Sequence, residues 1–311
     1  MPGLTKRLGK VKRSRAMKDL HTFAICAYQD SPYLEACIRS VLGQSRPTKV
    51  ILCTSTPSPY LEGLAKAYRI PMFVREGEPG IGRDWNFAYR MADSRYVTIA
   101  HQDDLYGRDY VKELERAVSR YPDTCLFATA YVTVKNRTLA RGERLEWVKR
   151  LLRLPLSFPK LNHIPLVKKA ALSLGNSICC PSCAYRKEEG EAGKERADSV
   201  DSIDSADSTD SADRTDNIQP VFSESLRFVL DWEHLICLAE GKGRFICAEK
   251  PLVYHRLHPE AATNACMKGR LRLEEEEAMF SRLWPGPVVK VLMKYYQKAY
   301  DSYEDGEGQA G

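Results

Sequence analysis

Tyr96-Val-Thr-Ile-Ala-His-Gln-Asp-Asp104 carries the strongest fold signal in this chain. An apolar run of strand character ends in two adjacent carboxylates, and the loop Leu105-Tyr-Gly107 then leads into an amphipathic helix. In open α/β sheets, ligands bind at the carboxyl ends of the strands. A carboxylate pair there suits a divalent cation that holds a phosphorylated ligand. The alternative is that both side chains only cap the next helix or solvate a turn.

Two strand–helix units precede this stretch. Residues 23–28 and 50–54 are apolar, and each run is followed by the pentapeptide Ser-Pro-Tyr-Leu-Glu, which begins at Ser31 and again at Ser58. Serine at the N-cap with proline at the first helical position predicts a helix start at both sites. Strand–helix repeats of this length predict a parallel sheet with right-handed crossovers.

The alternation of strands and helices continues along the chain. The elements that we expect are a strand at 71–74, a helix at 84–92 after the Gly-rich loop 77–82, a helix at 108–121, a strand at 125–134, a basic amphipathic helix at 145–154, a strand at 177–184, a helix near 231–238, strands at 244–248 and 252–258, and two terminal helices broken at Trp284-Pro-Gly-Pro287. The sequence therefore predicts an α/β fold with a mostly parallel, doubly wound sheet.

Changes in pattern predict the domain organisation. Asp recurs at every third position from Asp198 to Asp216, with Ser or Thr beside most, so this tract buries too little apolar surface to fold. The divisions that we expect are a basic N-terminal tail (1–20), a ligand-binding half (21–134), a second half (135–265) interrupted by a disordered Asp/Ser-rich insertion (187–220), and C-terminal helices and tail (266–311).

Composition limits the class of protein. Hydrophobic residues make up 43% and charged residues 28% of the 311 residues, as in ordinary globular proteins. No apolar run reaches the roughly 18–20 residues that span a bilayer, and the N-terminus lacks the apolar core of a signal peptide. The ten cysteines are scattered through apolar segments, which is typical of buried thiols in a reducing compartment. We therefore expect a cytoplasmic protein.

The net charge of +6 is unevenly distributed. Residues 1–18 hold seven basic residues and no acid, and residues 135–170 hold ten basic residues against Glu143 and Glu146. Such patches suit an anionic partner, although a solvated surface is the simpler alternative. Because aromatic residues are not interleaved with them, we expect no nucleic-acid partner.

The ordered motifs resemble the family 2 inverting glycosyltransferases of GT-A fold, including the bacterial group called glycosyltransferase family A, over residues 21–265. The order and spacing of the motifs make the resemblance specific. They are Cys26-Ala-Tyr-Gln29, Ser40-Val-Leu-Gly-Gln44, Asp84-Trp-Asn86, His101-Gln-Asp-Asp104, Leu230-Asp-Trp-Glu233 and His255-Arg-Leu-His258.

The resemblance implies transfer of a sugar from a nucleotide-sugar donor to an acceptor hydroxyl, with Mn²⁺ or Mg²⁺ as cofactor. The acceptor would be a glycan or lipid-linked, as in cell-surface polysaccharide or glycolipid synthesis. Asp104 and His258 would bind the metal, and Asp231 would be the catalytic base. The donor-binding residues would be Ala27, Tyr28, Thr54, Gly82, Asn86 and Asp103. For Asp231 the alternative is an acid at a helix N-terminus, and for His258 a surface histidine.

Two positions depart from the family pattern. The second strand of the family ends in an acid that recognises uracil, whereas Cys53-Thr-Ser-Thr56 contains no carboxylate. The first acid of the metal motif is replaced by His101. The nucleotide base therefore stays open.

Three rival interpretations remain. A catalytically degenerate GT-A protein would only bind a glycan, a lipid head group or a nucleotide. Cys180-Pro-Ser-Cys183 could be a zinc or redox site, but it lacks a second ligand pair. A sugar nucleotidyltransferase would carry an early Gly-rich, basic loop, which residues 26–31 do not provide.

The basic segments also predict peripheral association with the inner face of a membrane. The segments concerned are the N-terminal tail, the helix at 145–154 and the apolar-basic run Val288–Tyr300. Ordinary surface and packing helices would produce the same pattern.

Overall fold

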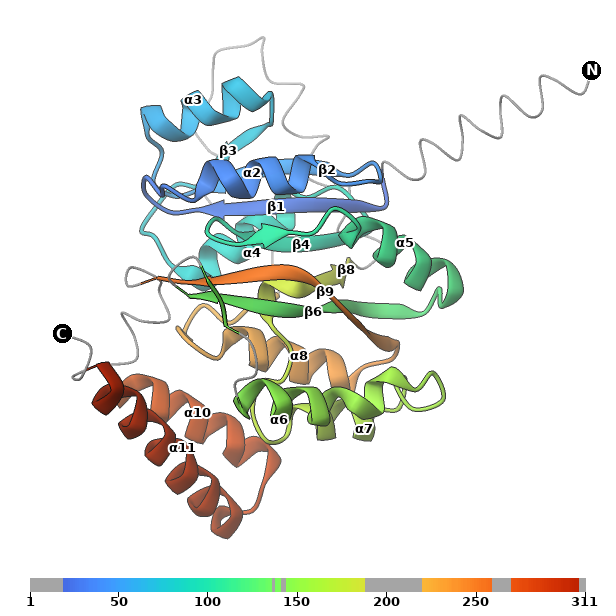
Figure 1. Ribbon diagram of the computed structural model, residues 1–311, viewed down its shortest axis with the longest axis vertical. Helices are drawn as coiled ribbons and strands as arrows, with labels where there is room; N and C mark the ends of the chain where they lie inside the picture. The colour runs from blue at the N-terminus through green and yellow to red at the C-terminus, as the bar shows by residue number, and fades with distance from the viewer. Residues whose placement is uncertain (1–18, 136–137, 141–143, 188–219, 259–269, 308–311) are drawn as a thin grey trace, which may run out of the picture.

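The computed structural model describes residues 19–135, 138–140, 144–187, 220–258 and 270–307 (Figure 1). Most of the expected basic tail and nearly all of the expected Asp/Ser-rich insertion lie outside the described residues.

The described strands form one sheet in the order β3-β2-β1-β4-β8-β6-β9-β5, with β7 paired to β6. Neighbours among β1 to β4 are parallel, as are β6 and β9, while β8 runs antiparallel between β4 and β6. The strands are β1 His21–Ala27, β2 Lys49–Thr54, β3 Met72–Val74, β4 Tyr96–His101, β5 Leu105–Tyr106, β6 Thr124–Lys135, β7 Thr138–Ala140, β8 Cys183–Arg186 and β9 Arg244–Leu257. The predicted mostly parallel α/β sheet is confirmed.

Helices cover both faces of this sheet (Figure 1). The α-helices are α2 Leu34–Leu42, α3 Pro59–Tyr68, α4 Ile81–Met91, α5 Tyr110–Arg120, α6 Arg144–Arg153, α7 Pro165–Leu172, α8 Leu230–Glu240, α10 Arg270–Leu283 and α11 Gly286–Glu307, with short 3-10 helices η1 Leu154–Ser157 and η2 Cys180–Ser182. Alternate residues of β1 point to opposite faces: Phe23 and Ile25 pack with α2 and α5, whereas Ala24 packs with α4 and α8. Two hydrophobic cores result, one on each face.

The two identical pentapeptides do not start their helices in the same way. Ser58 caps α3 as predicted, because its Oγ accepts a hydrogen bond from the backbone N–H of Leu61 at 3.3 Å. The Oγ of Ser31 instead accepts from the N–H of Tyr33, and α2 begins only at Leu34. The first helix therefore begins two residues later than predicted.

The expected strand at 177–184 is largely wrong. Residues 180–182 form the 3-10 helix η2, and β8 begins at Cys183. Pro181 has no N–H for a strand ladder, and the N–H of Ser182 turns back to the carbonyl of Cys179 at 2.9 Å. The strands expected at 244–248 and 252–258 are one strand, β9, whose register shifts near Pro251.

The last two helices are separated where the sequence predicted. They form a hairpin at the end of the molecule remote from α3 (Figure 1). The indole of Trp284 donates to the carbonyl of Ser173 at 2.7 Å, and the hydroxyl of Tyr296 donates to that of Leu174 at 2.9 Å, which fixes the hairpin on α7. In the described parts of the chain, no helix combines the length and the apolar character needed to cross a bilayer.

Helix α4 anchors both flanks of residues 188–219. On one flank, the ammonium of Lys187 donates to the carbonyls of Tyr89 and Ala92 at 3.0 and 2.8 Å, at the C-terminal end of α4. On the other flank, Asn86 in the same helix bonds both the N–H and the carbonyl of Phe222, each at 2.8 Å. The chain therefore leaves and re-enters the described fold along one helix.

Candidate functional site

The carboxyl ends of three parallel strands meet at one edge of the sheet. In the register of β1, Cys26 is paired with Cys53 of β2 on one side and with His101 of β4 on the other. Ala27 and Thr54, two of the residues expected to bind a donor, therefore lie beside the turn that carries Asp103 and Asp104. This is the edge at which α/β sheets bind ligands.

Asp104 is a fully buried carboxylate, with 0% of its surface exposed. Its Oδ1 accepts a hydrogen bond from the backbone N–H of Arg256 at 2.9 Å and lies 3.0 Å from Nδ1 of His255. Burial alone would raise the pKa of Asp104, but the charge and hydrogen bond of His255 outweigh burial and hold it below its usual value. Asp104 is therefore a fixed negative charge.

His255 is the counterpart of that charge. Burial alone would lower its pKa, but the charge and hydrogen bond of Asp104 raise it above the ordinary histidine value. The sequence resemblance singled out His258 instead, three residues further along β9 and its exit. His255 was missed because the pattern shows two histidines and does not reveal which one reaches Asp104.

Asp103 and His258 form a second pair beside the first. Nε2 of His258 lies 3.1 Å from the carboxylate of Asp103, and the Arg256 guanidinium donates to the backbone carbonyl of Asp103 at 2.7 Å. The ring of Tyr33 packs against both His258 and Arg256. Its centroid lies 4.8 Å from the centroid of the His258 ring and 4.4 Å from the guanidinium carbon of Arg256. The end of β9 thus holds both carboxylates in place.

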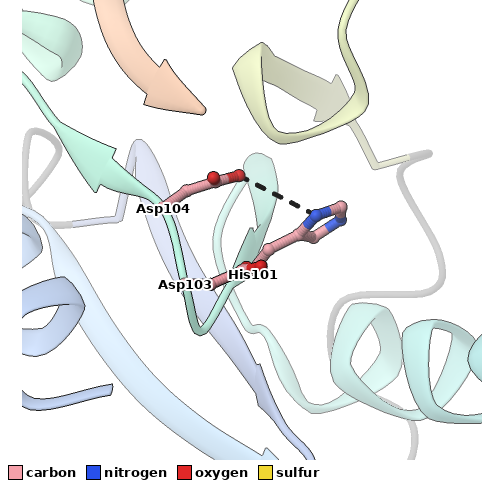
Figure 2. A group of neighbouring side chains, drawn as sticks. All are labelled: His101, Asp103 and Asp104. Carbon is pink, nitrogen blue, oxygen red and sulfur yellow. Dashed lines mark ion pairs between the residues drawn. The ribbon is translucent and has the colours of Figure 1, made fainter. Parts of the chain in front are cut away.

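His101 faces Asp104 across the turn (Figure 2). Its Nδ1 lies 3.9 Å from the Asp104 carboxylate, and its ring packs beside Trp85 at 5.1 Å between centroids. Burial lowers the pKa of His101, so the imidazole is neutral. Its Nε2 is buried and has no hydrogen-bond partner in the described part of the chain.

Among the described residues, one group has the composition and spacing of a metal site. Ligand atoms of His101, Asp103 and Asp104 all lie within 4.8 Å of one another (Figure 2). Two carboxylates and a neutral imidazole with an unbonded nitrogen match the ligand preferences of Mn²⁺ and, through oxygen, Mg²⁺. The residues present fit a divalent cation. His258 lies on Asp103 rather than in this group, so its role as a ligand stays a prediction.

Asp231 lies in the first turn of α8, where the sequence placed it. Its carboxylate accepts hydrogen bonds from the side-chain amide of Asn176 at 2.7 Å and from the N–H of Trp232 at 2.8 Å. Burial raises the pKa of Asp231 from 3.8 to about 6, because these neutral donors compensate for the lost water only in part. A carboxylate with such a pKa accepts a proton near neutral pH.

Glu275 of α10 holds the segment that leads into α8. Its buried carboxylate accepts hydrogen bonds from the backbone N–H groups of Arg227, Phe228 and Val229 at 2.9, 2.8 and 3.3 Å. These donors immediately precede α8, so Glu275 satisfies N–H groups that the helix cannot. Sequence reasoning missed this contact, because a run of four glutamates does not reveal that Glu275 and Glu276 are the buried ones or which of them reaches the start of α8.

Gly82 and Asn86, both expected to bind a donor, hold the chain segment around Phe222. A Cβ added at Gly82 would collide with the carbonyl oxygen of Ser223, so only glycine permits this close approach. Asn86 is buried and uses its amide on the backbone of Phe222. Any effect on a donor would act through this segment, and donor binding by these two residues stays a prediction.

Asp84 of α4 places a carboxylate beside the end of β2. The family pattern has an acid at the end of this strand, and Cys53-Thr-Ser-Thr56 lacks one. Its Oδ2 accepts from the hydroxyl of Ser55 at 3.1 Å, and its Oδ1 pairs with the Arg75 guanidinium at 2.7 Å. Tyr28 is exposed, and its backbone N–H and carbonyl both bond the side-chain amide of Gln102 at 3.0 Å. These contacts tie β1, β2 and the β4 turn together.

Lys149 of α6 connects the two acidic ends of the site. Its ammonium donates to the hydroxyl of Tyr131 at 3.2 Å, and its charge lowers the pKa of both Asp231 and His255. The charges of Asp104 and Asp231 in turn both raise the pKa of the Cys179 thiol, which burial raises most. Both carboxylates therefore lie within electrostatic range of Cys179.

The Cys-x-x-Cys sequence begins directly after Cys179, and both of its thiols are buried. The nine cysteines in the described residues are all free. Burial raises the pKa of Cys180 and Cys183 well above the usual thiol value. Since zinc and redox chemistry both use the thiolate, these residues are poorly suited to either.

Comparisons with known proteins give one family and one fold. The family described as Glycosyl transferase family 2 matches residues 22–189, which is more than half of the chain. A structure of S. aureus TarS residues 1–349 has 15% identity and a TM-score of 0.50, with 84% of this chain and 69% of that chain covered. The same TarS segment in complex with UDP-GlcNAc has 13% identity and a TM-score of 0.57, with 91% and 73% covered. At these identities the likeness shows the fold alone, which confirms the GT-A architecture. Among curated proteins, no match was found.

Proposed function

Because the chain belongs to glycosyl transferase family 2, we propose that it transfers a sugar from a nucleotide-sugar donor to an acceptor hydroxyl with inversion at the sugar carbon. The observation that carries this proposal is a pair of carboxylates, the buried Asp104 and the partly buried Asp231, whose pKa values shift in opposite directions. Asp104 is held negative by His255, whereas the pKa of Asp231 is raised to about 6. One carboxylate suits charge stabilisation, and the other suits proton transfer.

The Asp103–Asp104 turn is the proposed donor end of the site. When bound by Asp104, Asp103 and His101, Mn²⁺ or Mg²⁺ supplies positive charge for the departing nucleoside diphosphate. We favour Mn²⁺, since an imidazole ligand suits Mn²⁺ better than Mg²⁺. Ala27, Tyr28 and Thr54 lie along the same edge and are proposed to contact the nucleoside.

The α8 end is the proposed acceptor side. Asp231 accepts the proton of the acceptor hydroxyl, while Asn176 and the N–H of Trp232 hold its carboxylate in one orientation. Lys149 lowers the pKa of Asp231, which keeps a useful fraction of the base deprotonated at neutral pH. The acceptor class is a glycan or a lipid-linked saccharide.

One observation favours the second candidate, a donor-binding protein without catalysis. The carboxylate of Asp104 already accepts two hydrogen bonds from within the protein, and His101 stands at an acidic position of the family motif. A protein of that kind would bind a nucleotide sugar without divalent-dependent turnover.

A panel of nucleotide sugars tests both candidates. UDP-GlcNAc comes first, because the similar TarS structure contains it. Thermal shift and donor hydrolysis are measured with and without Mn²⁺, on the wild type, Asp104→Asn and Asp231→Asn. The matched control is Asp123→Asn, which precedes β6 at the opposite edge of the sheet.

We expect Mn²⁺-dependent stabilisation and hydrolysis in the wild type and the control, with hydrolysis lost in Asp104→Asn. Stabilisation without hydrolysis would identify a binding protein. No stabilisation by any donor would rule out both candidates.

A further inference from the structure

Helix α6, η1 and the start of α7 present an apolar surface that the protein body does not cover. Trp147 is 66% exposed, Leu151 is 68% exposed and Leu166 is 74% exposed. The exposed large apolar side chains of this stretch, which we call the α6–η1 platform, are Trp147, Val148, Leu151, Leu154, Phe158, Leu161 and Leu166. Large apolar side chains gathered in one short stretch mark an interaction site.

The platform is a supported surface. Trp147 and Leu151 are four residues apart and Leu154 follows three residues later, so they share one face. Beneath them, Leu156 is buried and its carbonyl accepts from the side chain of Asn162 at 3.2 Å. The carbonyl of Asn162 in turn accepts from the N–H of Phe245 in β9 at 3.0 Å. These contacts fix the platform on the central sheet.

Basic side chains outnumber acidic ones around the platform, where Glu146 precedes Trp147 in α6 and Glu249 pairs with Arg150. From Trp147 to Lys187 the sequence contains no Asp or Glu, whereas Arg150, Arg153 and Lys160 lie among the apolar residues. The Arg150 guanidinium carbon lies 5.8 Å from the Trp147 ring centroid, and its ion pair with Glu249 is 3.6 Å long and largely exposed. An exposed pair of this kind gives up little when the arginine meets another anion.

We propose that the α6–η1 platform docks on the surface of an anionic phospholipid bilayer. Exposed Trp and Leu side chains enter the boundary between head groups and acyl chains, and the interspersed arginines and lysine meet the negative phosphates. The charge complementarity selects this occupant over an apolar protein surface, which would leave Arg150, Arg153 and Lys160 without counter-charges.

The packing of α7 connects docking to the site. Leu166 of the platform lies at the start of α7, and the carbonyl of Leu172 at the end of that helix accepts a hydrogen bond from the indole of Trp232, the neighbour of Asp231, at 2.9 Å. A docked platform therefore brings the Asp231 side of the site next to the bilayer. Resting on the proposed function, this geometry specifies the acceptor class as a saccharide anchored in the membrane by a lipid.

Vesicle co-sedimentation of the full chain at low salt tests the docking. The probes are vesicles of phosphatidylcholine alone and of phosphatidylcholine mixed with phosphatidylglycerol. We expect binding to the mixed vesicles only, with a blue shift of tryptophan emission. The double variants Trp147→Ser/Leu151→Ser and Arg150→Glu/Arg153→Glu should each lower partitioning roughly tenfold or more.

The matched control changes an equally exposed apolar pair elsewhere. Val291 is 69% exposed and Tyr295 is 73% exposed on α11, in the run Val288–Tyr300 that the sequence also predicts to associate with a membrane. If the platform is the docking surface, Val291→Ser/Tyr295→Ser should leave partitioning unchanged. Trp147→Phe should bind but lose most of the blue shift. Absence of binding to mixed vesicles, or a loss in the α11 variant instead, would overturn the proposal. A platform variant that changes only the oligomeric state in size-exclusion chromatography would assign the surface to a second copy of the chain.

Donor hydrolysis without vesicles separates this inference from the proposed function. The platform variants should hydrolyse a nucleotide sugar at the wild-type rate, since none of the changed residues contacts the site. Membrane binding without any hydrolysis would reject the enzyme and retain the docking surface. Hydrolysis without membrane binding would reject the docking surface and retain the enzyme.

Discussion

Asp104 and Asp231 are the same residue type, the first fully and the second partly removed from solvent, yet their pKa values shift in opposite directions. Burial favours the protonated form in both cases. Asp104 is in contact with His255, whose charge and hydrogen bond hold the pKa of Asp104 below its usual value. Asp231 receives hydrogen bonds only from neutral donors, the amide of Asn176 and the N–H of Trp232, and its pKa rises to about 6. The charge of the partner, more than burial, therefore determines what each carboxylate can do.

The largest effect is expected from removing the fixed charge. Asp104→Asn leaves His255 without its anion and the metal group without its buried carboxylate, so donor turnover should fall at least roughly 10³-fold. Initial rates with saturating Mn²⁺ measure the loss, and the melting temperature controls for folding. If His255→Gln loses activity while Asp104→Asn keeps most of it, Asp104 is not the fixed charge on which turnover depends.

The next effect is expected at Asp231, the proposed base. Asp231→Asn should lower the transfer rate about 10²- to 10³-fold, because the acceptor hydroxyl loses its base. Donor binding, followed by Mn²⁺-dependent thermal shift, should be unchanged. The matched control is Glu233→Gln, in the same turn of α8 and paired with Arg282 at 3.1 Å. An equal loss in both variants would indicate a structural effect on α8 in place of catalysis.

The pH dependence should separate the two carboxylates. Because Asp231 must be deprotonated to act as a base and has a pKa of about 6, kcat/KM should fall about tenfold per pH unit below that value. Asp104 stays ionised through this range, since its pKa is held below the ordinary value. The range from about pH 5 to about pH 7 brackets the pKa of Asp231. A kcat/KM profile that is flat over this range would show that Asp231 is not the base.

The same raised pKa affects stability with a defined sign. The folded state binds a proton at Asp231 more tightly than the unfolded state, so the free energy of unfolding decreases as pH rises from 3.8 to about 6. Above this window the buried charge costs up to about 3 kcal/mol. Asp231→Asn should therefore raise the melting temperature at pH 7 and change it little at pH 4. A lower melting temperature at pH 7 would contradict the raised pKa.

The smallest effect is expected from the support of α8. Glu275→Ala removes an acceptor for three backbone N–H groups and should lower kcat about tenfold, at a cost of roughly 1–2 kcal/mol of stability. The KM for the donor should change little, and kcat should recover in part in Glu275→Gln. Glu277→Ala, an exposed position two residues along α10, is the matched control. A rise in KM without a change in kcat would assign Glu275 to the donor end.

The placement of Asp103, Asp104 and Asp231 could be predicted from the sequence because each follows from local structure. An apolar strand that runs into carboxylates places them at the sheet edge, and a first-turn acid before an apolar helix places Asp231. The roles of these residues remain untested. Long-range contacts were not predictable: His255 reaches Asp104 across 151 positions, and Glu275 reaches Val229 across 46. Spacing alone does not reveal the register that brings such partners together.

The errors in the predicted fold have the same origin. Ser31 and Ser58 begin identical pentapeptides, yet only Ser58 caps its helix, because Ser31 hydrogen-bonds the N–H of Tyr33 instead. β8 was placed too early, since its position between β4 and β6 depends on pairing with two distant strands. Local propensity predicts that an element exists more reliably than it predicts where it begins.

Helix α4 gives this fold a place for insertions. The carbonyl of Ala92 at its C-terminal end holds Lys187, and Asn86 near its middle holds Phe222, so the two anchors are about six helical residues apart, roughly 9 Å. About three extended residues would suffice to cross that distance. Doubling the length of a connecting segment costs only about 0.6 kcal/mol. Additions here should therefore hardly weaken the hydrogen bonds that hold Lys187 and Phe222 on α4. A longer, shorter or foreign segment inserted between the two anchors should therefore leave both carboxylates in place.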